Sequence, residues 1–345
     1  MLDTTAMIRC NPRTDARWRR LADEHGDLFN SSRWLAVLHQ GYGIEFDSVV
    51  FGHGQGGFAW AEIKDVRGTR ITSLPFSDFA DPPGLPSSTD LGAAIEPLLD
   101  RGCPVTLRFL RSRLPELSGL VEVDRLAWHR ASLPATEDEL WNSVKSGARQ
   151  NIRKAKGQGL EITIGSTREM LRQFRRLHVS LRKSKYRMLA QPTAFFDAIA
   201  DRFGPDDLRV VLASDDGVVV AGLVLLRHRD TAYYKFNAST DRALAIRAND
   251  LVMWTSLVEA QRWGCRQFDF GVSDLDQPGL IRYKRKYATE ESEVVVLKSR
   301  AVAEPSPLAS SVGRSLPRLT HLLTDERCPD RLTGWGGDVL YRLFC

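Results

Sequence analysis

The sequence predicts an α/β protein of two tandem domains, in which helices flank mixed, mainly antiparallel sheets. The 345 residues exceed one domain of about 150 residues. Helical and strand patterns alternate along the chain, and both halves run from helices through a meander to a helix and a strand. We expect a first domain over residues 1–140, a second over residues 141–300, and a helical tail over residues 301–345 that packs on the body.

The first domain opens with two helical patterns, over residues 16–26 and 31–43. Residues 46–76 contain strand-like segments separated by Gly-rich turns, which is typical of an antiparallel meander. A loop rich in Pro, Ser and Asp follows. A helix over residues 91–102 and a strand over residues 104–110 complete the domain.

The second domain follows a short linker. Its expected elements are a helix over residues 141–159, a strand over 161–166, helices over 167–184 and 193–204, strands over 207–214 and 218–228, the central stretch described next, and a last strand over 291–300.

The central stretch, residues 232–288, organises the second domain. An alternating aromatic strand, YYKF, leads through a polar turn to a helix that Asn249 can cap. The apolar run QFDFGVS, which contains Asp269, is then expected as a buried strand. A strand, helix and strand of this length form a βαβ unit with parallel neighbouring strands. Ligands of such units gather at the carboxyl ends of the strands, so we expect a cleft near Lys235, Asn237, Asp269 and the segment PGLIRYKRKYA.

Composition limits the classes of protein to consider. The chain is 43% hydrophobic and 26% charged, as in globular proteins, and no apolar run is long enough to span a bilayer. The polar start MLDTTAMIRC lacks the features of a signal peptide, so we expect a cytoplasmic location. The five cysteines form no CxxC pair and the histidines lack ligand spacing, so we expect no metal site.

The positive charge is concentrated in one segment. Residues 145–187 carry 13 basic and 2 acidic side chains, an excess of +11, whereas the whole chain has a net charge of +5. Lys145, Arg149 and Arg153 are spaced to share one helix face. Such a field favours an anionic partner such as nucleic acid, a nucleotide, a phosphorylated lipid or a membrane surface. The alternative, a solvated helix face, is the commoner case for charge runs.

Several motifs in a fixed order suggest a family. They are KSGARQNIRKAKGQGLEI, YYKFNAST, RANDLVMWTSLVEAQRWG, FDFG and PGLIRYKRKYA, preceded by LFNSSRWLAVLHQGYG and SLPFSDF. The set resembles the FemAB-like (BioF2-like) branch of the GNAT acetyltransferase superfamily, with two GNAT-like domains in tandem, over roughly residues 10–300. The resemblance implies transfer of an acyl or aminoacyl group to an amine. Its best-known members take an amino acid from charged tRNA to a peptidoglycan precursor, and relatives act in exopolysaccharide or natural-product pathways.

This chain departs from the family pattern at the site where the donor would bind. Acetyl-CoA enzymes of the superfamily carry a (Gln/Arg)-x-x-Gly-x-(Gly/Ala) loop whose backbone N–H groups bind the pyrophosphate. Residues 242–247 stand in register here, and neither glycine position holds Gly. This argues against conventional acetyl-CoA binding and leaves aminoacyl-tRNA, or another acyl-CoA or acyl-carrier protein, as donor, with no tightly bound cofactor. Arg247 can hold a phosphate, or the turn is simply structural.

A second departure concerns the acceptor. Peptidoglycan-directed relatives tend to have a Lys one helical turn after the Trp that corresponds to Trp34, whereas this chain has Leu38. A nucleotide-linked muramyl peptide is therefore a doubtful acceptor. The chain also lacks the inserted helical hairpin of some relatives, so a tRNA would contact the globular surface.

The resemblance assigns the reacting end of the donor to the aromatic-Lys pair Tyr283 and Lys284. We expect Lys284 to stabilise developing negative charge and Tyr283 to pack the donor, although four cations in five residues are also compatible with a solvated basic turn. Asp269 either accepts a proton from the amine or orients a cation. The expected substrate-binding residues are Lys235, Asn237, Arg247, Asn249 and Lys286, with Arg149 and Arg153 as phosphate or tRNA contacts.

Three functions remain open from the sequence. The first is an aminoacyl or acyltransferase acting on an amine of a cell-envelope, polysaccharide or natural-product acceptor. The second is an N-acyltransferase that uses acyl-CoA or acyl-carrier protein on an amino sugar in exopolysaccharide biosynthesis. The third is a non-catalytic protein that binds RNA or a nucleotide sugar. A peripheral membrane contact of the tail is the alternative to its packing on the body.

Overall fold

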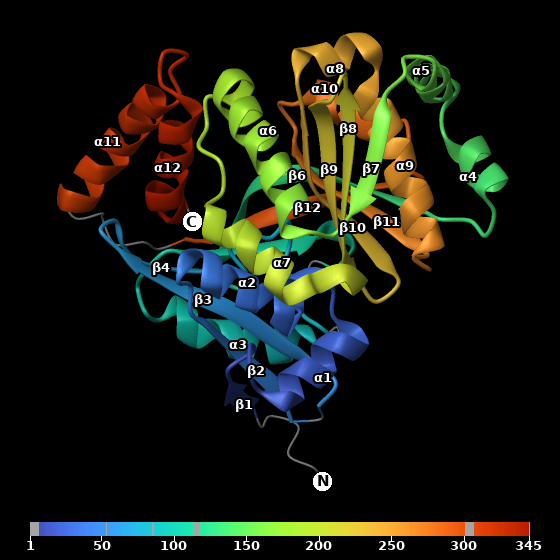
Figure 1. Cartoon of the computed structure of the whole chain (residues 1–345). Helices are drawn as coiled ribbons and strands as arrows, with labels where there is room; N and C mark the ends of the chain where they lie inside the picture. Colours follow the sequence, from blue (N-terminus) through green and yellow to red (C-terminus); the bar gives the residue numbers. More distant parts are fainter. Residues whose placement is uncertain (1–6, 53, 85, 114–116, 301–306, 345) are drawn as a thin grey trace. The chain divides into compact units, whose positions relative to one another are not determined.

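The computed structural model describes residues 7–52, 54–84, 86–113, 117–300 and 307–344. The chain forms two compact units (Figure 1). The first comprises the described residues of 1–126, 292–319 and 342–345, and the second comprises residues 127–291 and 320–341. These limits differ from the predicted 140 and 300 because the last strand returns to pair with a strand of the first unit. The tandem-domain limits stay a prediction.

The first unit combines a mixed sheet with helices. Its elements are β1 (Met7–Cys10), α1 (Ala16–His25), η1 (Leu28–Asn30), α2 (Ser32–Tyr42), β2 (Phe46–Phe51), β3 (Gly57–Asp65), β4 (Gly68–Thr72), α3 (Ser88–Leu99), β5 (Val105–Leu110), η2 (Arg111–Arg113) and most of β12 (Glu290–Ser299). The strand order is β1-β2-β3-β4-β5-β12, with only β4 and β5 parallel. Apolar residues of α3, including Leu91, Ile95 and Leu98, pack against strand residues such as Phe58 and Phe109.

From residue 161 to residue 274 the second unit has the predicted order of strands and helices, with one short helix in addition, whereas the last predicted strand lies mostly in the first unit. Its elements are α4 (Glu137–Ser143), α5 (Ser146–Lys156), β7 (Glu161–Gly165), α6 (Arg168–Tyr186), α7 (Thr193–Asp207), β8 (Leu208–Asp215), β9 (Val218–His228), β10 (Thr231–Ser239), α8 (Asp241–Ile246), α9 (Ala248–Arg262), β11 (Gln267–Asp274), α10 (Pro278–Lys284) and α12 (Asp330–Leu340). Four elements have residues in both units: β12, whose Glu290 and Glu291 belong to the second, and β6 (Leu120–Ser132), α11 (Pro307–Leu323) and η3 (Tyr341–Phe344). The strand order is β6-β11-β10-β9-β8-β7.

Alternation along β8 places helices on both faces of this sheet (Figure 1). Val211 and Ala213 belong to the core that includes α9. On the other face, a Cβ added to Gly222 would meet Leu212 and Phe174 of α6. Successive residues of a strand point to opposite faces, so α9 and α6 cover the two sides of one sheet.

The predicted start of α9 is wrong by two residues. Arg247, with φ 62°, occupies the N-cap position, and no side chain caps the helix. Asn249 lies inside the first turn, where its Nδ2 donates to Ser239 Oγ at 2.8 Å. The apolar side of the helix is buried, with Leu251 and Trp254 packed in the core. Tertiary burial therefore stabilises α9 without a side-chain cap.

The βαβ unit itself is confirmed. β10 and β11 are parallel neighbours, paired from Thr231 with Gln267 to Tyr233 with Asp269. The pairing covers only three residues of each strand, although both strands continue to Ser239 and Asp274. The two strands therefore separate towards their carboxyl ends.

The second unit includes part of the C-terminal tail. α12 packs on α6 and α7, with Asp338 accepting from Arg175 Nη2 at 3.1 Å and from the Thr193 N–H at 2.6 Å. Among the helices in the described ranges, none is long and apolar enough to cross a membrane.

Candidate functional site

Two backbone irregularities open the sheet between β10 and β11. In β11, Gly271 has φ 65°, a left-handed conformation that residues with a Cβ rarely adopt. In β10, the pairing with β9 shifts register between Tyr234 and Phe236. Both irregularities follow closely on the last paired residues, Tyr233 and Asp269. They separate the carboxyl ends of two adjacent strands, which is where the ligands of a βαβ unit gather.

Asp269 holds the irregular conformation of β11. Its Oδ1 accepts from the Gly271 N–H at 2.6 Å, and its Oδ2 accepts from Trp128 Nε1 of β6 at 3.0 Å. The carboxylate is only 4% exposed. These bonds favour the positioning role over proton transfer, and the predicted catalytic role of Asp269 stays a prediction.

Lys284 lies at the separated end of β11. Its Nζ donates to the carbonyl oxygens of Val272 at 2.8 Å and Gly271 at 3.2 Å, and the side chain is buried. The ammonium also lies 5.9 Å from the centroid of the Tyr234 ring on β10. A lysine on α10 therefore brings a positive charge to the place where the two strands separate.

A buried network lies beside Lys284. The Tyr283 hydroxyl donates to the Asn249 carbonyl at 3.0 Å, and burial raises the pKa of Tyr283 well above its usual value. The Tyr287 hydroxyl donates to Asp250 Oδ1 at 2.8 Å, and burial also raises the pKa of Tyr287. Asp250 is further approached by Asn151 Nδ2 at 3.3 Å and by Lys286 Nζ at 3.6 Å. The network joins α10, α9 and α5.

Residues 242–247, which stand in register with the glycine loop of acetyl-CoA enzymes, do not form such a loop. Residues 241–246 form the short helix α8, which Thr240 caps by accepting from the Ala243 N–H. Arg247 then takes a left-handed conformation with its side chain exposed. The backbone at 247 keeps a conformation that suits Gly, whereas the side chain adds a cation. Phosphate binding by Arg247 stays a prediction.

The other expected binding residues fall into two groups. Asn237 on β10 donates through Nδ2 to the Gly222 carbonyl at 3.1 Å and to Asn249 Oδ1 at 3.4 Å, so it ties the strand to α9. Lys235 lies at the register shift of β10, with its Nζ 6.0 Å from the Phe236 ring. Arg149 and Arg153 lie on α5, where Arg153 is 5.3 Å from the Trp141 ring centroid. Substrate contacts of all four residues stay predictions.

Sequence patterns miss several residues around the site. Trp128 and His129 lie on β6, a strand that the sequence does not predict, and the patterns do not assign Tyr287 and Asp250 to the site. His129 is fully buried, with its Nε2 3.5 Å from Glu291 Oε2, and burial lowers its pKa. Tyr287 stands four residues after Tyr283, a helical spacing that could have identified the pair.

The first-unit motifs of the family resemblance are held together by buried hydrogen bonds. Trp34 Nε1 donates to Ser77 Oγ at 2.9 Å, and Asn30 Nδ2 donates to the Asp81 carbonyl at 2.8 Å. Burial raises the pKa of Asp27 to about 7 and that of Asp81 to about 6. Leu38 is also fully buried. These bonds connect the two motifs and the residues that follow them within this unit.

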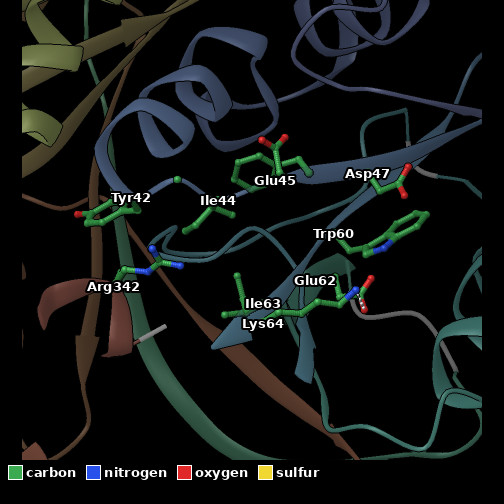
Figure 2. A pocket seen from close by; sticks show the side chains of 11 residues that line it. Tyr42, Ile44, Glu45, Asp47, Trp60, Glu62, Ile63, Lys64 and Arg342 are labelled. Atoms are coloured by element: carbon green, nitrogen blue, oxygen red, sulfur yellow. Dashed lines mark ion pairs between the residues drawn. The ribbon is translucent and has the colours of Figure 1, made fainter. Parts of the chain in front are cut away.

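A separate cavity of about 380 Å³ lies in the first unit (Figure 2). Its lining includes Trp60, Glu62, Lys64 and Arg342. Lys64 and Arg101 both pair with Glu62, at 3.1 and 2.9 Å, so the acidic side of the cavity is largely neutralised. In the part of the chain that the structure describes, no group of three His, Cys, Asp or Glu side chains could hold a metal ion.

Comparison with known proteins supports the resemblance. Residues 142–285 match the family model described as an acetyltransferase (GNAT) domain. No curated protein matches the sequence.

Three solved structures share the fold. FemX is 14% identical, with a TM-score of 0.63, over 84% of this chain and 96% of its own. The C-terminal domain of a putative lysylphosphatidylglycerol synthetase from Agrobacterium fabrum is 12% identical, with a TM-score of 0.57, over 87% and 95%. A tandem GNAT protein from the clavulanic acid biosynthesis pathway is 12% identical, with a TM-score of 0.54, over 87% and 99%. The predicted fold class is thereby confirmed.

Proposed function

We propose, from the premise that residues 142–285 form a domain of the GNAT acetyltransferase superfamily, that the protein moves an aminoacyl or acyl group onto an amine. The observation that carries the proposal is the opening between β10 and β11, with the buried Lys284 at its edge. An extended donor can lie where the two strands separate, and the lysine beside them can stabilise negative charge that develops on it.

In this reaction the acceptor amine, in its neutral form, attacks the carbonyl carbon of the donor. A C–N bond forms, the carbonyl oxygen gains negative charge, and the C–O bond of an ester or the C–S bond of a thioester then breaks. The amine proton passes to the leaving oxygen or sulfur. The Lys284 ammonium would stabilise the oxyanion, and the network of Tyr283, Tyr287 and Asp250 would fix α10 beside α9.

An aminoacyl ester of tRNA is the donor that we favour. Residues 241–246 form a helix and not a glycine loop, and the side chains of Ala245 and Arg247 hinder the close approach of a pyrophosphate to the main chain. In the described part of the chain, the cations of α5 have no acidic partner and are available to phosphates. The fold shared with the Agrobacterium fabrum protein, a putative lysylphosphatidylglycerol synthetase, agrees with aminoacyl transfer to an envelope component.

An N-acyltransferase that uses acyl-CoA or acyl-carrier protein on an amino sugar is the second candidate. It is favoured by the match to an acetyltransferase domain and by the tandem GNAT protein of a small-molecule pathway. Arg247 in its left-handed turn could then contact the nucleotide phosphates in place of main-chain amides.

The test compares donors in a transfer assay with a small primary amine as acceptor. Charged tRNA and acyl thioesters are supplied separately to the wild type and to Lys284→Met, which keeps the length of the side chain and removes its charge. We expect kcat/KM with the active donor to fall by about a hundredfold to a thousandfold. Arg285→Gln, at an exposed position paired with Glu291, is the matched control and should retain activity.

Equal activity of Lys284→Met and the wild type would reject the catalytic assignment. Turnover with thioesters alone would favour the second candidate. Binding of tRNA or a nucleotide sugar without turnover of any donor would identify a non-catalytic protein.

A further inference from the structure

The helix α12 packs through its smallest residues. Its buried side consists of Thr333, Gly334, Gly336 and Gly337. A Cβ at Gly337 would lie 2.3 Å from the Ala190 carbonyl oxygen, and one at Gly336 would lie 2.7 Å from Leu323 Cδ1. Glycine is unfavourable inside a helix, so its presence here is explained by this close approach.

The large apolar residues of α12 point the other way. Leu332, Trp335 and Val339 are 45%, 59% and 49% exposed. Their spacing of three and four residues places them on one stripe of the helix. Leu322, near the end of α11, is a further exposed residue of the same unit, at 67%. We call Leu332, Trp335 and Val339 the α12 stripe. Because the helix is already held by its glycine side, packing within the unit does not require large apolar residues at these positions.

The two acidic side chains of α12 are paired with α6, whereas two arginines beside the α12 stripe are not paired with acids. Asp330 pairs with Lys183 at 2.9 Å, and Asp338 pairs with Arg175 at 3.1 Å, so both acids are bound to α6. Arg327 and Arg331 are exposed, and the guanidinium of neither makes an ion pair among the described residues. Asp325, whose carboxylate accepts from the Arg327 N–H at 2.9 Å, offsets one of these charges, and Glu326 pairs with Arg187 at 3.0 Å. The surface beside the stripe therefore presents an excess of one positive charge together with apolar side chains.

We propose that the α12 stripe docks on the surface of an anionic lipid bilayer. A tryptophan suits the interface between headgroups and acyl chains, since its ring is apolar and its N–H can stay hydrated. Arginines beside an interfacial helix are attracted to anionic headgroups. A second copy of the chain fits less well, because a two-fold contact through this stripe would oppose the same arginines. The proposal is independent of the acyl-transfer reaction.

The experiment measures co-flotation of the full chain with two kinds of vesicle. One is phosphatidylcholine alone, and the other contains about one third phosphatidylglycerol. We expect binding to the second kind, and a loss of about tenfold or more in the partition constant for Trp335→Ser. Arg327→Gln/Arg331→Gln should remove the preference for the anionic vesicles. Val218→Ser is the matched control, because Val218 is 64% exposed but lies alone on β9.

The outcome can overturn the proposal in two ways. Equal flotation of Trp335→Ser and the wild type, with unchanged circular dichroism, would exclude the stripe as the lipid contact. A dimer that Trp335→Ser converts to a monomer would identify a second copy as the occupant. Transfer to a soluble amine should be unchanged in Trp335→Ser, so failure of the lipid proposal and failure of the proposed function give different results.

Discussion

The helices α5 and α6 come from the same basic segment of the sequence but use their cations differently. On α6 and its C-cap, seven cations make ion pairs or main-chain bonds: Arg168 with Asp197 and Asp201, Arg172 with Asp197, Arg175 with Asp338, Arg176 with Glu169, Arg182 with the Leu189 carbonyl, Lys183 with Asp330, and Arg187 with Glu326. On α5 and its N-cap, the cations have no acidic partner in the described ranges: Lys145, Arg149, Arg153, Lys154 and Lys156.

The difference shows that a run of positive charge does not by itself define a binding surface. The acids that neutralise α6 come mostly from α7 and the tail, including Asp197, Asp330 and Asp338. Lys183 is buried and bonds both Asp330 and the Cys328 carbonyl, so it attaches the tail to the unit. The predicted anionic partner is therefore expected at α5, and the cations of α6 are mainly structural.

The largest effect is expected from removing the charge of α5. The variant Lys145→Gln/Arg149→Gln/Arg153→Gln/Lys156→Gln should bind tRNA with a slope of log K against log salt that is smaller by about 3, since each phosphate contact contributes roughly 0.7 to 0.9. Its melting temperature should fall by about a few degrees at most, because these side chains form no ion pairs in the described structure and the loss is limited to the contacts of Arg153 and Lys156 with the Trp141 ring. Filter binding over a salt series measures the slope.

The matched control removes cations from α6. Arg168→Gln/Arg172→Gln/Arg176→Gln should change the slope by less than about 1, because Asp197, Asp201 and Glu169 already neutralise these arginines. The same loss of slope in both variants would contradict the distinction between the two helices.

The second prediction concerns the inner side of α6. His178 is buried, its Nε2 lies 2.7 Å from Gln191 Oε1, and burial lowers its pKa to about 3. In the unfolded chain the pKa returns to about 6.5, so below that pH the unfolded state binds a proton that the folded state does not. The contribution of His178 to stability is thus present above pH 6.5 and is lost as the pH falls towards 3, by up to about 1.4 kcal/mol per pH unit.

Urea unfolding at several pH values tests this dependence. The difference in unfolding free energy between the wild type and His178→Gln should shrink below pH 6.5. On α5 the inner residues are not ionisable, so Ile152→Val should give a difference of about 1 kcal/mol that does not vary with pH. A constant difference for His178→Gln as well would show that its protonation does not affect stability.

Local patterns in the sequence predict the central βαβ unit of the second unit well. The strands β10 and β11 and the helix α9 each carry an apolar pattern of their own, and their parallel pairing follows from chain order. The start of α9 is missed because Asn249 bonds Ser239 and does not cap the helix. The short helix α8 is missed because the pattern at residues 241–246 suggests only a polar turn.

The opening between the strands depends on contacts that no local pattern contains. Trp128 reaches Asp269 across 141 positions of the sequence, from a strand whose V-E-V-D alternation at residues 121–124 breaks at Arg125. The left-handed Gly271 is visible in the sequence only as a glycine within a strand, which is a signal for a bend or a close approach. Ion pairing on α6 is equally invisible, because Arg175 finds its partner at Asp338 in the tail.

The smallest effect separates two neighbouring cations of α5. Arg153 lies 5.3 Å from the Trp141 ring centroid, whereas no ring contact or acidic partner of Lys154 is present in the described structure. A cation at an exposed ring contributes about 0.5 to 1 kcal/mol, so Arg153→Gln should lower the free energy of unfolding by about 0.5 kcal/mol and Lys154→Gln should leave it unchanged. Both should reduce the salt slope of tRNA binding by about the same amount, roughly 0.7 to 0.9, if each meets a phosphate. Chemical unfolding and filter binding on the same preparations measure the two quantities. A loss of slope in Arg153→Gln alone would mean that Trp141 orients the guanidinium towards the nucleic acid. The surface of α5 that contacts nucleic acid would then include fewer residues than the helix has cations.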